Sequence, residues 1–255
     1  MSEETVVDVV SGGTMAPFVF VCEHASHYIP EKYNDLGVSD EARFSHIAWD
    51  PGARDITLNL AKAFNAPAVV GCVSRIVYDC NRPPEAPDSI PSRSEAFDIP
   101  GNRDLGLDQI ADRVVKYYRP FERALIGVLD THAIKPVLVT IHSFAPVYNG
   151  KSRSVQLGVL HDQDARMADS ILAQAGSHTE MQVERNQPYG PEDGVTHTLK
   201  LHGLSRGLLN VMLEIRSDFI QSASQTDAVS EMLTSLLSDA VGKVHSTLVD
   251  ERAPG

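Results

Sequence analysis

The chain has 255 residues, and its 34 Asp and Glu against 22 Lys and Arg give a formal net charge of −12. So acidic an average surface repels a phosphate backbone and argues against a nucleic-acid partner. Hydrophobic residues make up 42% of the chain, as in ordinary globular proteins, and no apolar run approaches the roughly 20 residues of a membrane helix. We expect one domain over residues 1–255, no membrane contact and, since the N-terminus is acidic where a signal peptide is basic, a cytoplasmic location.

Short apolar runs alternate with amphipathic ones in the first half of the chain. Residues 17–22 (PFVFVC) are β-branched and aromatic and predict a buried strand. Helical spacing of apolar side chains predicts a helix over residues 53–64, and residues 67–73 and 75–80 both predict strands. Residues 83–106 are rich in Pro, Ser, Asp and Gly, and predict a long surface loop of the kind that covers a site.

The second half continues this alternation. An amphipathic pattern over residues 107–133 predicts a long helix interrupted at Pro120. Further strands are predicted over residues 136–141, 155–160, 181–185 and 209–215, and further helices over residues 164–175 and 226–249. This order predicts an α/β fold in which helix layers enclose a mostly parallel sheet. Ligands of such folds bind beyond the carboxyl ends of the strands.

Side chains that bind metals, transfer protons or grip carboxylates come at the ends of four predicted strands. They are Glu23, His24 and His27 after residues 17–22, Asn81 and Arg82 after residues 75–80, His142 and Ser143 after residues 136–141, and Glu214 and Arg216 at the end of residues 209–215. In a parallel sheet these strand ends share one edge, so we expect one site there.

Two of these histidines indicate a metal centre. A hydrolytic zinc needs about three protein ligands and one open position, where the pKa of bound water falls to about 7. His24 and His142 suit two ligand positions, and Glu23, His27 and Asp50 are the candidates for the third. We favour Asp50, because it lies at the start of a predicted helix in an otherwise apolar setting.

Glu214 is the most informative single carboxylate in the sequence. It ends an apolar strand, and a buried carboxylate is costly unless it is paired or used in chemistry. Paired with Arg216 it would be structural. Otherwise it is placed to act as a general base that takes a proton from the activated water and delivers it to the leaving nitrogen.

Arginines near the strand ends indicate an anionic small-molecule substrate, because the planar guanidinium suits a carboxylate. The polar loop over residues 185–194 and the residues after it are expected to line the same pocket, although His197 also fits a solvent-facing helix position. The expected substrate contacts are Arg75, Arg82, Arg216, Asn81, Ser143, Asn186 and His197.

The sequence gives little support to three other kinds of chemistry: serine hydrolysis, nucleotide binding and catalysis by a cysteine nucleophile. The sequence has no G-x-S-x-G elbow, no P-loop and no G-x-G-x-x-G after the first strand, which argues against serine hydrolysis and nucleotide binding. Cys22 is a poor nucleophile candidate, because neighbouring strand residues point to opposite faces. The remaining alternative to an enzyme is a non-catalytic binding protein that keeps the pocket for a carboxylate metabolite.

The ordered motifs CEHAS, WDPGA, SRIVYDCNRP, IHSF, NQPYG and LEIRSD resemble the N-formylglutamate amidohydrolase family over about residues 17–220. That family is similar to zinc carboxypeptidases and aspartoacylases. The resemblance implies a phosphorylase/hydrolase-like three-layer α/β/α sandwich, a hydrolytic metal and cleavage of N-formylglutamate. It implies His24, Asp50 and His142 at the metal, Glu214 as base and the arginines as substrate contacts.

The sequence departs from its relatives at the first histidine. The carboxypeptidase-type H-x-x-E is absent, and His27 stands where its glutamate would be. Members of the family devoted to histidine breakdown have proline and glycine around this histidine, whereas this chain reads Glu23-His24-Ala25-Ser26. We therefore expect a substrate that is N-formylglutamate or another N-acyl amino acid, and zinc as the metal, although the ligand types also suit iron, cobalt or nickel.

Overall fold

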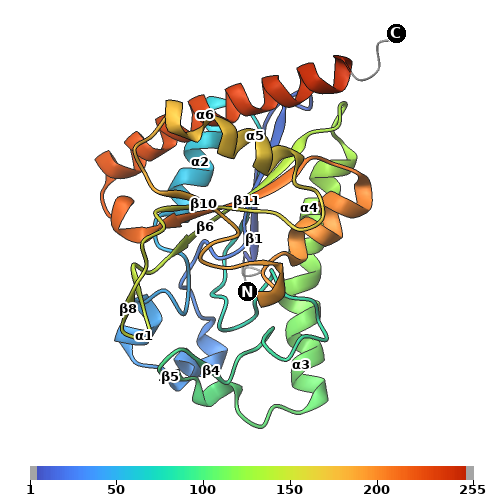
Figure 1. The fold of residues 1–255 in the computed structure, drawn as a ribbon. Coiled ribbons are helices and arrows are strands. Elements are labelled where there is room, and N and C mark those ends of the chain that lie inside the picture. The colour runs from blue at the N-terminus through green and yellow to red at the C-terminus, as the bar shows by residue number, and fades with distance from the viewer. Residues whose placement is uncertain (1–4, 251–255) are drawn as a thin grey trace.

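A seven-stranded sheet forms the centre of the computed structural model, which describes residues 5–250 (Figure 1). The sheet order is β1-β3-β2-β6-β11-β9-β10. The strands are β1 (Val7–Val10), β2 (Phe18–Cys22), β3 (Ala68–Gly71), β6 (Val137–Phe144), β9 (Leu157–Leu160), β10 (Val183–Arg185) and β11 (Asn210–Arg216). The first four residues, part of the acidic N-terminus from which we expect no signal peptide, lie outside the described chain.

The strand directions confirm a mixed, mostly parallel sheet. Strands β3, β2, β6 and β11 run parallel to one another, whereas β9 runs antiparallel to β11, and β10 is parallel to β9. Strand β1 is antiparallel to β3 at the far edge. The carboxyl ends of β2, β6 and β11 therefore meet at one edge of the sheet, where β9 and β10 begin.

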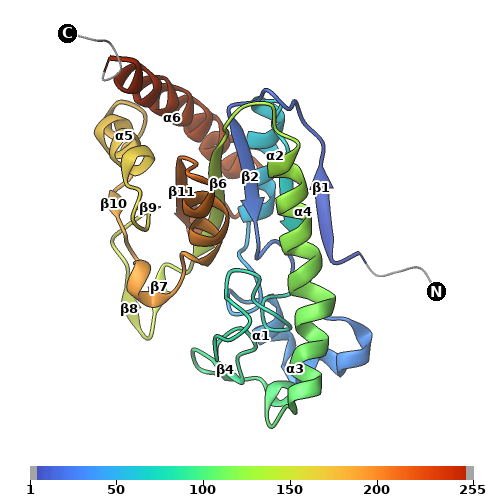
Figure 2. The same cartoon turned by 90° about the vertical axis from the view of Figure 1, so that its right-hand side faces the viewer.

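Helices cover both faces of the sheet, which gives the predicted three-layer sandwich (Figures 1 and 2). One face carries α2 (Ala53–Ala63), α5 (Arg166–Gln174) and α6 (Ala223–Asp250), which pack on one another. The other face carries α4 (Arg119–Asp130). Side chains of β2 alternate between these layers, because Phe18 and Phe20 pack in the α2–α6 core and Val19 and Val21 pack under α4.

The predicted long helix over residues 107–133 is present as a helical column over residues 107–130. It consists of α3 (Leu107–Arg113), a π-helical turn over Val114–Tyr118, and α4. The irregular turn ends just before Pro120, where the proline lacks the N–H that regular α-helical bonding requires. The predicted interruption is thus a local change of helical geometry and not a break.

The strand predicted over residues 75–80 is wrong. Strand β3 ends at Gly71, and residues 75–80 form turns, with the Val77 N–H donating to the Ser74 carbonyl and the Arg82 N–H to the Asp79 carbonyl. The apolar run is buried all the same. Its side chains pack in a second core outside the sheet, so burial explains their composition without strand pairing.

Two small hairpins and one short helix complete the surface around the site edge. The hairpin β4 (Arg93–Ser94) and β5 (Phe97–Asp98) lies within the predicted loop of residues 83–106. The hairpin β7 (Val147–Tyr148) and β8 (Lys151–Ser152) follows β6, and α1 (Asp40–Phe44) lies in the segment between β2 and α2. No helix in residues 5–250 is both long and apolar enough to span a membrane.

Candidate metal centre and substrate cavity

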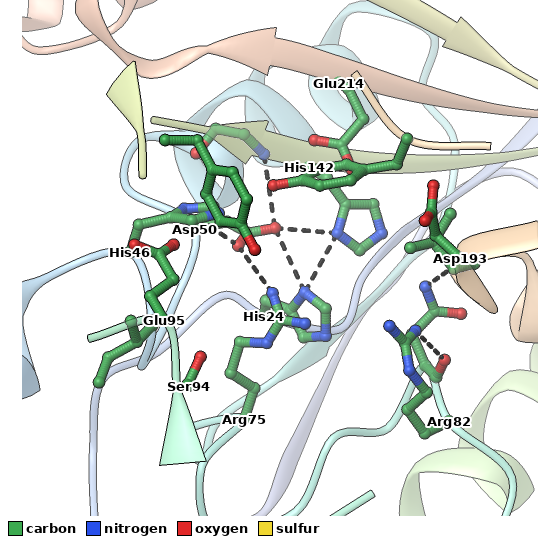
Figure 3. Close-up of a pocket in the computed structure, with 16 residues that line it drawn as sticks. His24, His46, Asp50, Arg75, Arg82, Ser94, Glu95, His142, Asp193 and Glu214 are labelled. Carbon is green, nitrogen blue, oxygen red and sulfur yellow. Dashed lines mark hydrogen bonds and ion pairs between the residues drawn. The ribbon is translucent and has the colours of Figure 1, made fainter. Parts of the chain in front are cut away.

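A cavity of about 270 Å³ opens at the edge where β2, β6 and β11 end. Its wall includes His24, which follows β2, His142 and Ser143 near the end of β6, and Glu214 of β11 (Figure 3). These residues are adjacent because the sheet register pairs Glu214 with His142 on neighbouring parallel strands, so that both side chains leave the same face. The expected convergence of strand ends is therefore present.

His24, Asp50 and His142 bring three ligand atoms together in the buried part of this cavity. Asp50 Oδ2 lies 2.9 Å from His142 Nδ1 and 3.3 Å from His24 Nδ1, and the two Nδ1 atoms are 3.2 Å apart (Figure 3). All three residues are buried, and their ligand atoms lie within 4.8 Å of one another. Two imidazoles and one carboxylate form a donor set that binds divalent metals.

A buried carboxylate lies next to the Nε2 atom of each histidine. His24 Nε2 is 2.7 Å from Asp79 Oδ1, and His142 Nε2 is 3.2 Å from Glu23 Oε2. Because a carboxylate only accepts, Asp79 and Glu23 favour an N–H on Nε2 of each ring. Asp50 Oδ2 lies at both Nδ1 atoms and favours a proton there until a cation replaces it. Two lone pairs facing each other at 3.2 Å repel unless a proton or a cation lies between them.

The charges of the triad follow from these contacts. Burial opposes ionisation of Asp50, but His24 and His142 hold the pKa of its carboxyl well below the usual value. Burial also opposes a charge on His142, but Glu23 and Asp50 raise the pKa of this imidazole well above the usual value. The protein alone thus keeps a proton in the triad at neutral pH, and a metal ion would have to displace it.

Asp50 owes its position to the loop before α2. Its backbone N–H donates to the His24 carbonyl at 2.8 Å, and its Oδ2 accepts from the Ser143 N–H at 3.4 Å. Gly52 then adopts φ = 80° at the start of α2, where a Cβ would lie 2.8 Å from Ile220. The turn that brings Asp50 between the histidines therefore requires glycine at position 52.

The other two candidates for the third ligand lie elsewhere. Glu23 continues the β2 face of Val19 and Val21, which turns its carboxylate toward His142 Nε2 and not toward the triad. The His27 ring packs against the rings of Phe44 and Trp49, with centroid distances of 4.9 and 5.0 Å. Of the three candidates, only Asp50 meets both histidines at the ligand position.

Glu214 lies in the same cavity with 5% of its surface exposed, and its Oε2 has no hydrogen-bond partner among the described residues. Burial raises the pKa of this carboxyl to about 7, assisted by the charge of Asp50 and opposed by His142 and His24. It does not pair with Arg216, whose guanidinium binds Asp218 at 2.8 Å. A buried, unpartnered carboxyl of this kind is suited to proton transfer.

Two of the expected arginines line the cavity, and both already hold carboxylates. The Arg75 guanidinium binds Asp79 at 2.7 Å and lies 3.6 Å from Asp50 Oδ1, next to the triad. The Arg82 Nε donates to Asp88 at 2.6 Å, and its Nη1 donates to the carbonyls of Asn81 and Gly194. The arginines thus lie at separate positions on the cavity wall (Figure 3).

Asn81 and Ser143 also line the cavity, but their polar groups serve the backbone. Asn81 donates to the Val195 carbonyl at 2.6 Å and accepts from the Thr198 N–H at 3.0 Å, which anchors the loop after η5 (Pro191–Asp193). The Ser143 hydroxyl donates to the Pro51 carbonyl at 2.8 Å. Both residues therefore position the wall of the cavity.

Three expected substrate contacts do not line the cavity. Asn186 follows β10, whose direction is opposite to that of β11, because β10 is parallel to β9 and β9 is antiparallel to β11. Asn186 therefore lies at the other end of the strands, where its side chain accepts a hydrogen bond from the His161 N–H. Arg216 is engaged by Asp218 and by the Arg153 carbonyl. The His197 Nε2 is 2.8 Å from the Tyr118 hydroxyl, away from the cavity wall.

Several wall residues were not singled out in the sequence. They are His46, Tyr148, Tyr189, Glu95 and Asp193. His46 lies 3.7 Å from Asp50 Oδ1, and burial lowers the pKa of its imidazole to about 4, so it is neutral at pH 7. Tyr189 and Asp193 belong to the loop of residues 185–194 that is predicted to line the pocket, and Glu95 belongs to the predicted loop of residues 83–106. Because these segments have no periodicity, only the tertiary structure identifies the individual side chains.

The fold is a phosphorylase/hydrolase-like α/β/α sandwich with a candidate metal centre at the carboxyl ends of its parallel strands. The sequence model of N-formylglutamate amidohydrolases matches residues 16–221. The chain therefore belongs to the N-formylglutamate amidohydrolase family, whose members are hydrolases that act on amide bonds. No curated protein matches the chain.

Two solved structures are similar over nearly the whole chain. A gene product of Agrobacterium tumefaciens is 45% identical with a TM-score of 0.92, covering 96% of this chain and 98% of its own. N-formylglutamate amidohydrolase from Ralstonia eutropha is 16% identical with a TM-score of 0.69, covering 95% of this chain and 99% of its own. At 16% identity the second likeness concerns the fold alone.

Proposed function

We propose that the protein is a metal-dependent amidohydrolase that cleaves the amide of an N-formyl or N-acyl amino acid, and that residues 1–255 form one catalytic unit. The observation that supports the proposal is that the Nδ1 atoms of His24 and His142 lie next to Asp50 Oδ2. Glu214, whose Oε2 has no hydrogen-bond partner among the described residues, lines the same cavity. This arrangement offers ligands for a cation and a base for proton transfer in one cavity.

The residues present fit a zinc ion. His24 and His142 supply neutral nitrogen ligands, Asp50 supplies a charged oxygen, and Asp79 and Glu23 orient the two rings from behind. A zinc ion held there would lower the pKa of a water molecule and polarise the substrate carbonyl. The triad lines the cavity of about 270 Å³, which would admit the water molecule and the substrate.

Glu214 is the proposed proton carrier. Its side chain lines the cavity and its Oε2 has no hydrogen-bond partner among the described residues, so the carboxylate accepts a proton from the attacking water as the carbonyl carbon is attacked. It then gives this proton to the amide nitrogen as the C–N bond breaks. The products are a carboxylic acid and a free amine, and the carboxyl returns to its starting state after each turnover.

The two arginines of the cavity have separate proposed roles. Arg75 lies 3.6 Å from Asp50 Oδ1, so its positive charge is beside the reacting carbonyl and stabilises negative charge on the oxygen in the transition state. Arg82 lies further along the wall, where its planar guanidinium suits the carboxylate of the amino-acid part. A small anionic substrate is the partner that this arrangement fits.

A Glu214→Gln substitution tests the assignment of the base. We expect the rate of amide cleavage to fall at least about a thousandfold, as when a general base is removed, while metal content is retained. The matched control is Glu231→Gln, which removes an exposed carboxylate of α6 and leaves cleavage unchanged. Near-normal turnover by Glu214→Gln would show that another group carries the proton.

A further inference from the structure

The cations of the cavity wall are already neutralised. Arg75 binds Asp79 and also faces Asp50, and Arg82 binds Asp88. His46, the other basic residue of the wall outside the triad, faces a carboxylate as well, because its Nδ1 lies 3.7 Å from Asp50 Oδ1. Arg82 can exchange the exposed Asp88 for one substrate carboxylate, but no second free cation lines the described cavity.

Two carboxylates on the same wall have no basic partner among residues 5–250. Glu95 comes from the β4–β5 hairpin and lies on the His46 side of the cavity, and Asp193 comes from η5 and lies on the Arg82 side (Figure 3). Asp193 Oδ2 accepts a hydrogen bond from the Gly190 N–H at 2.8 Å. The unpartnered, nine-tenths buried Glu214 in the same cavity marks it as a ligand site.

Arg153 is a further cation beside two residues of the wall, and aromatic rings cover it. Its guanidinium lies over the rings of Tyr148 and Tyr189 at 4.5 and 4.8 Å, and its Nη2 donates to the Tyr189 hydroxyl. Both tyrosines line the cavity, whereas Arg153 does not. A second substrate carboxylate would reach Arg153 only if these rings moved aside.

We infer that the cavity selects N-acyl amino acids with one carboxylate and a neutral or basic side chain, and discriminates against an acidic side chain such as that of N-formylglutamate. The inference rests on the proposed function and narrows it. A second carboxylate would lose water without gaining an arginine, and would face the exposed carboxylates of Glu95 and Asp193 on the same wall.

The isosteric pair N-formylglutamine and N-formylglutamate tests this charge selection directly. We expect kcat/KM to be at least about tenfold higher for the glutamine compound, a difference of about 1.4 kcal/mol, and N-formyllysine to be cleaved at least as well as N-formylglutamine. In the double variant Glu95→Gln, Asp193→Asn this ratio falls toward one. The control Glu192→Gln, which removes an exposed carboxylate next to Asp193, leaves the ratio unchanged.

Binding to the Glu214→Gln protein separates this inference from the proposed function. A larger rise in melting temperature with N-formylglutamine than with N-formylglutamate supports the charge selection even if neither compound is cleaved. Preference for N-formylglutamate, in turnover or in binding, overturns it. Loss of that preference in Arg153→Met would then identify Arg153 as the cation that receives the second carboxylate.

Discussion

Glu23 and Asp79 show how single residues orient a metal site from behind. Glu23 is buried, and its Oε2 lies 3.2 Å from His142 Nε2. Such partners fix the ring and raise its basicity, and their loss lowers metal affinity about 10- to 100-fold. We expect this fall in Glu23→Gln, measured by competition with a chromophoric chelator. The exposed Glu180→Gln is the control, and equal affinities in the two variants would remove Glu23 from the metal site.

The ionisation of Glu214 makes a separate prediction about stability. Its pKa is about 7 in the folded protein against 4.5 for the ordinary group, so rising pH ionises the unfolded state first and lowers the free energy of unfolding between these values. In metal-free protein at pH 8, Glu214→Gln should be more stable than wild type by about 3 kcal/mol, because each pKa unit corresponds to about 1.4 kcal/mol. Urea denaturation should show this gain shrinking toward pH 4.5. A gain independent of pH would contradict the buried-charge explanation.

At the scale of elements, the segment of residues 194–198 is held to the rest of the site by two side chains. Asn81 bonds Val195 and Thr198, and Arg82 donates to the Gly194 carbonyl. Asn81→Ala leaves these buried backbone groups without partners, at about 1–3 kcal/mol. We expect faster hydrogen exchange at the Thr198 amide and a raised KM. Asn59→Ala, on the far α2–α6 surface, is the control, and unchanged exchange at Thr198 would argue against the tether.

The sequence predicts an element correctly where the local residue pattern determines it. It does not predict strand direction or contacts between distant segments. The runs that form β2, β6 and β11 are buried on both faces, so composition alone identifies them. Residues 75–80 have the same composition but fill a core outside the sheet. Asn186 was expected at the site edge because the reversal of β9 and β10 cannot be read from a sequence. The sequence leaves three candidates for the third metal ligand, and only the conformation of the loop before α2 brings Asp50 next to both histidines.

At the scale of the whole molecule, the triad joins segments that are distant in sequence. His24 follows β2, Asp50 precedes α2 and His142 lies in β6. A metal ion that binds all three in the folded state, and not in the unfolded chain, stabilises the fold by mass action. We expect the melting temperature to fall on chelation and to recover with zinc, while His142→Ala protein shows neither change.

The most direct test of the central claim is the metal content of the purified protein, measured together with formate or amine release from a panel of N-formyl and N-acyl amino acids. We predict near-stoichiometric zinc, and release that a chelator abolishes and added zinc restores. Protein that takes up no metal and releases nothing with zinc present, yet is stabilised by carboxylate metabolites, would contradict the account and identify a non-catalytic binding protein.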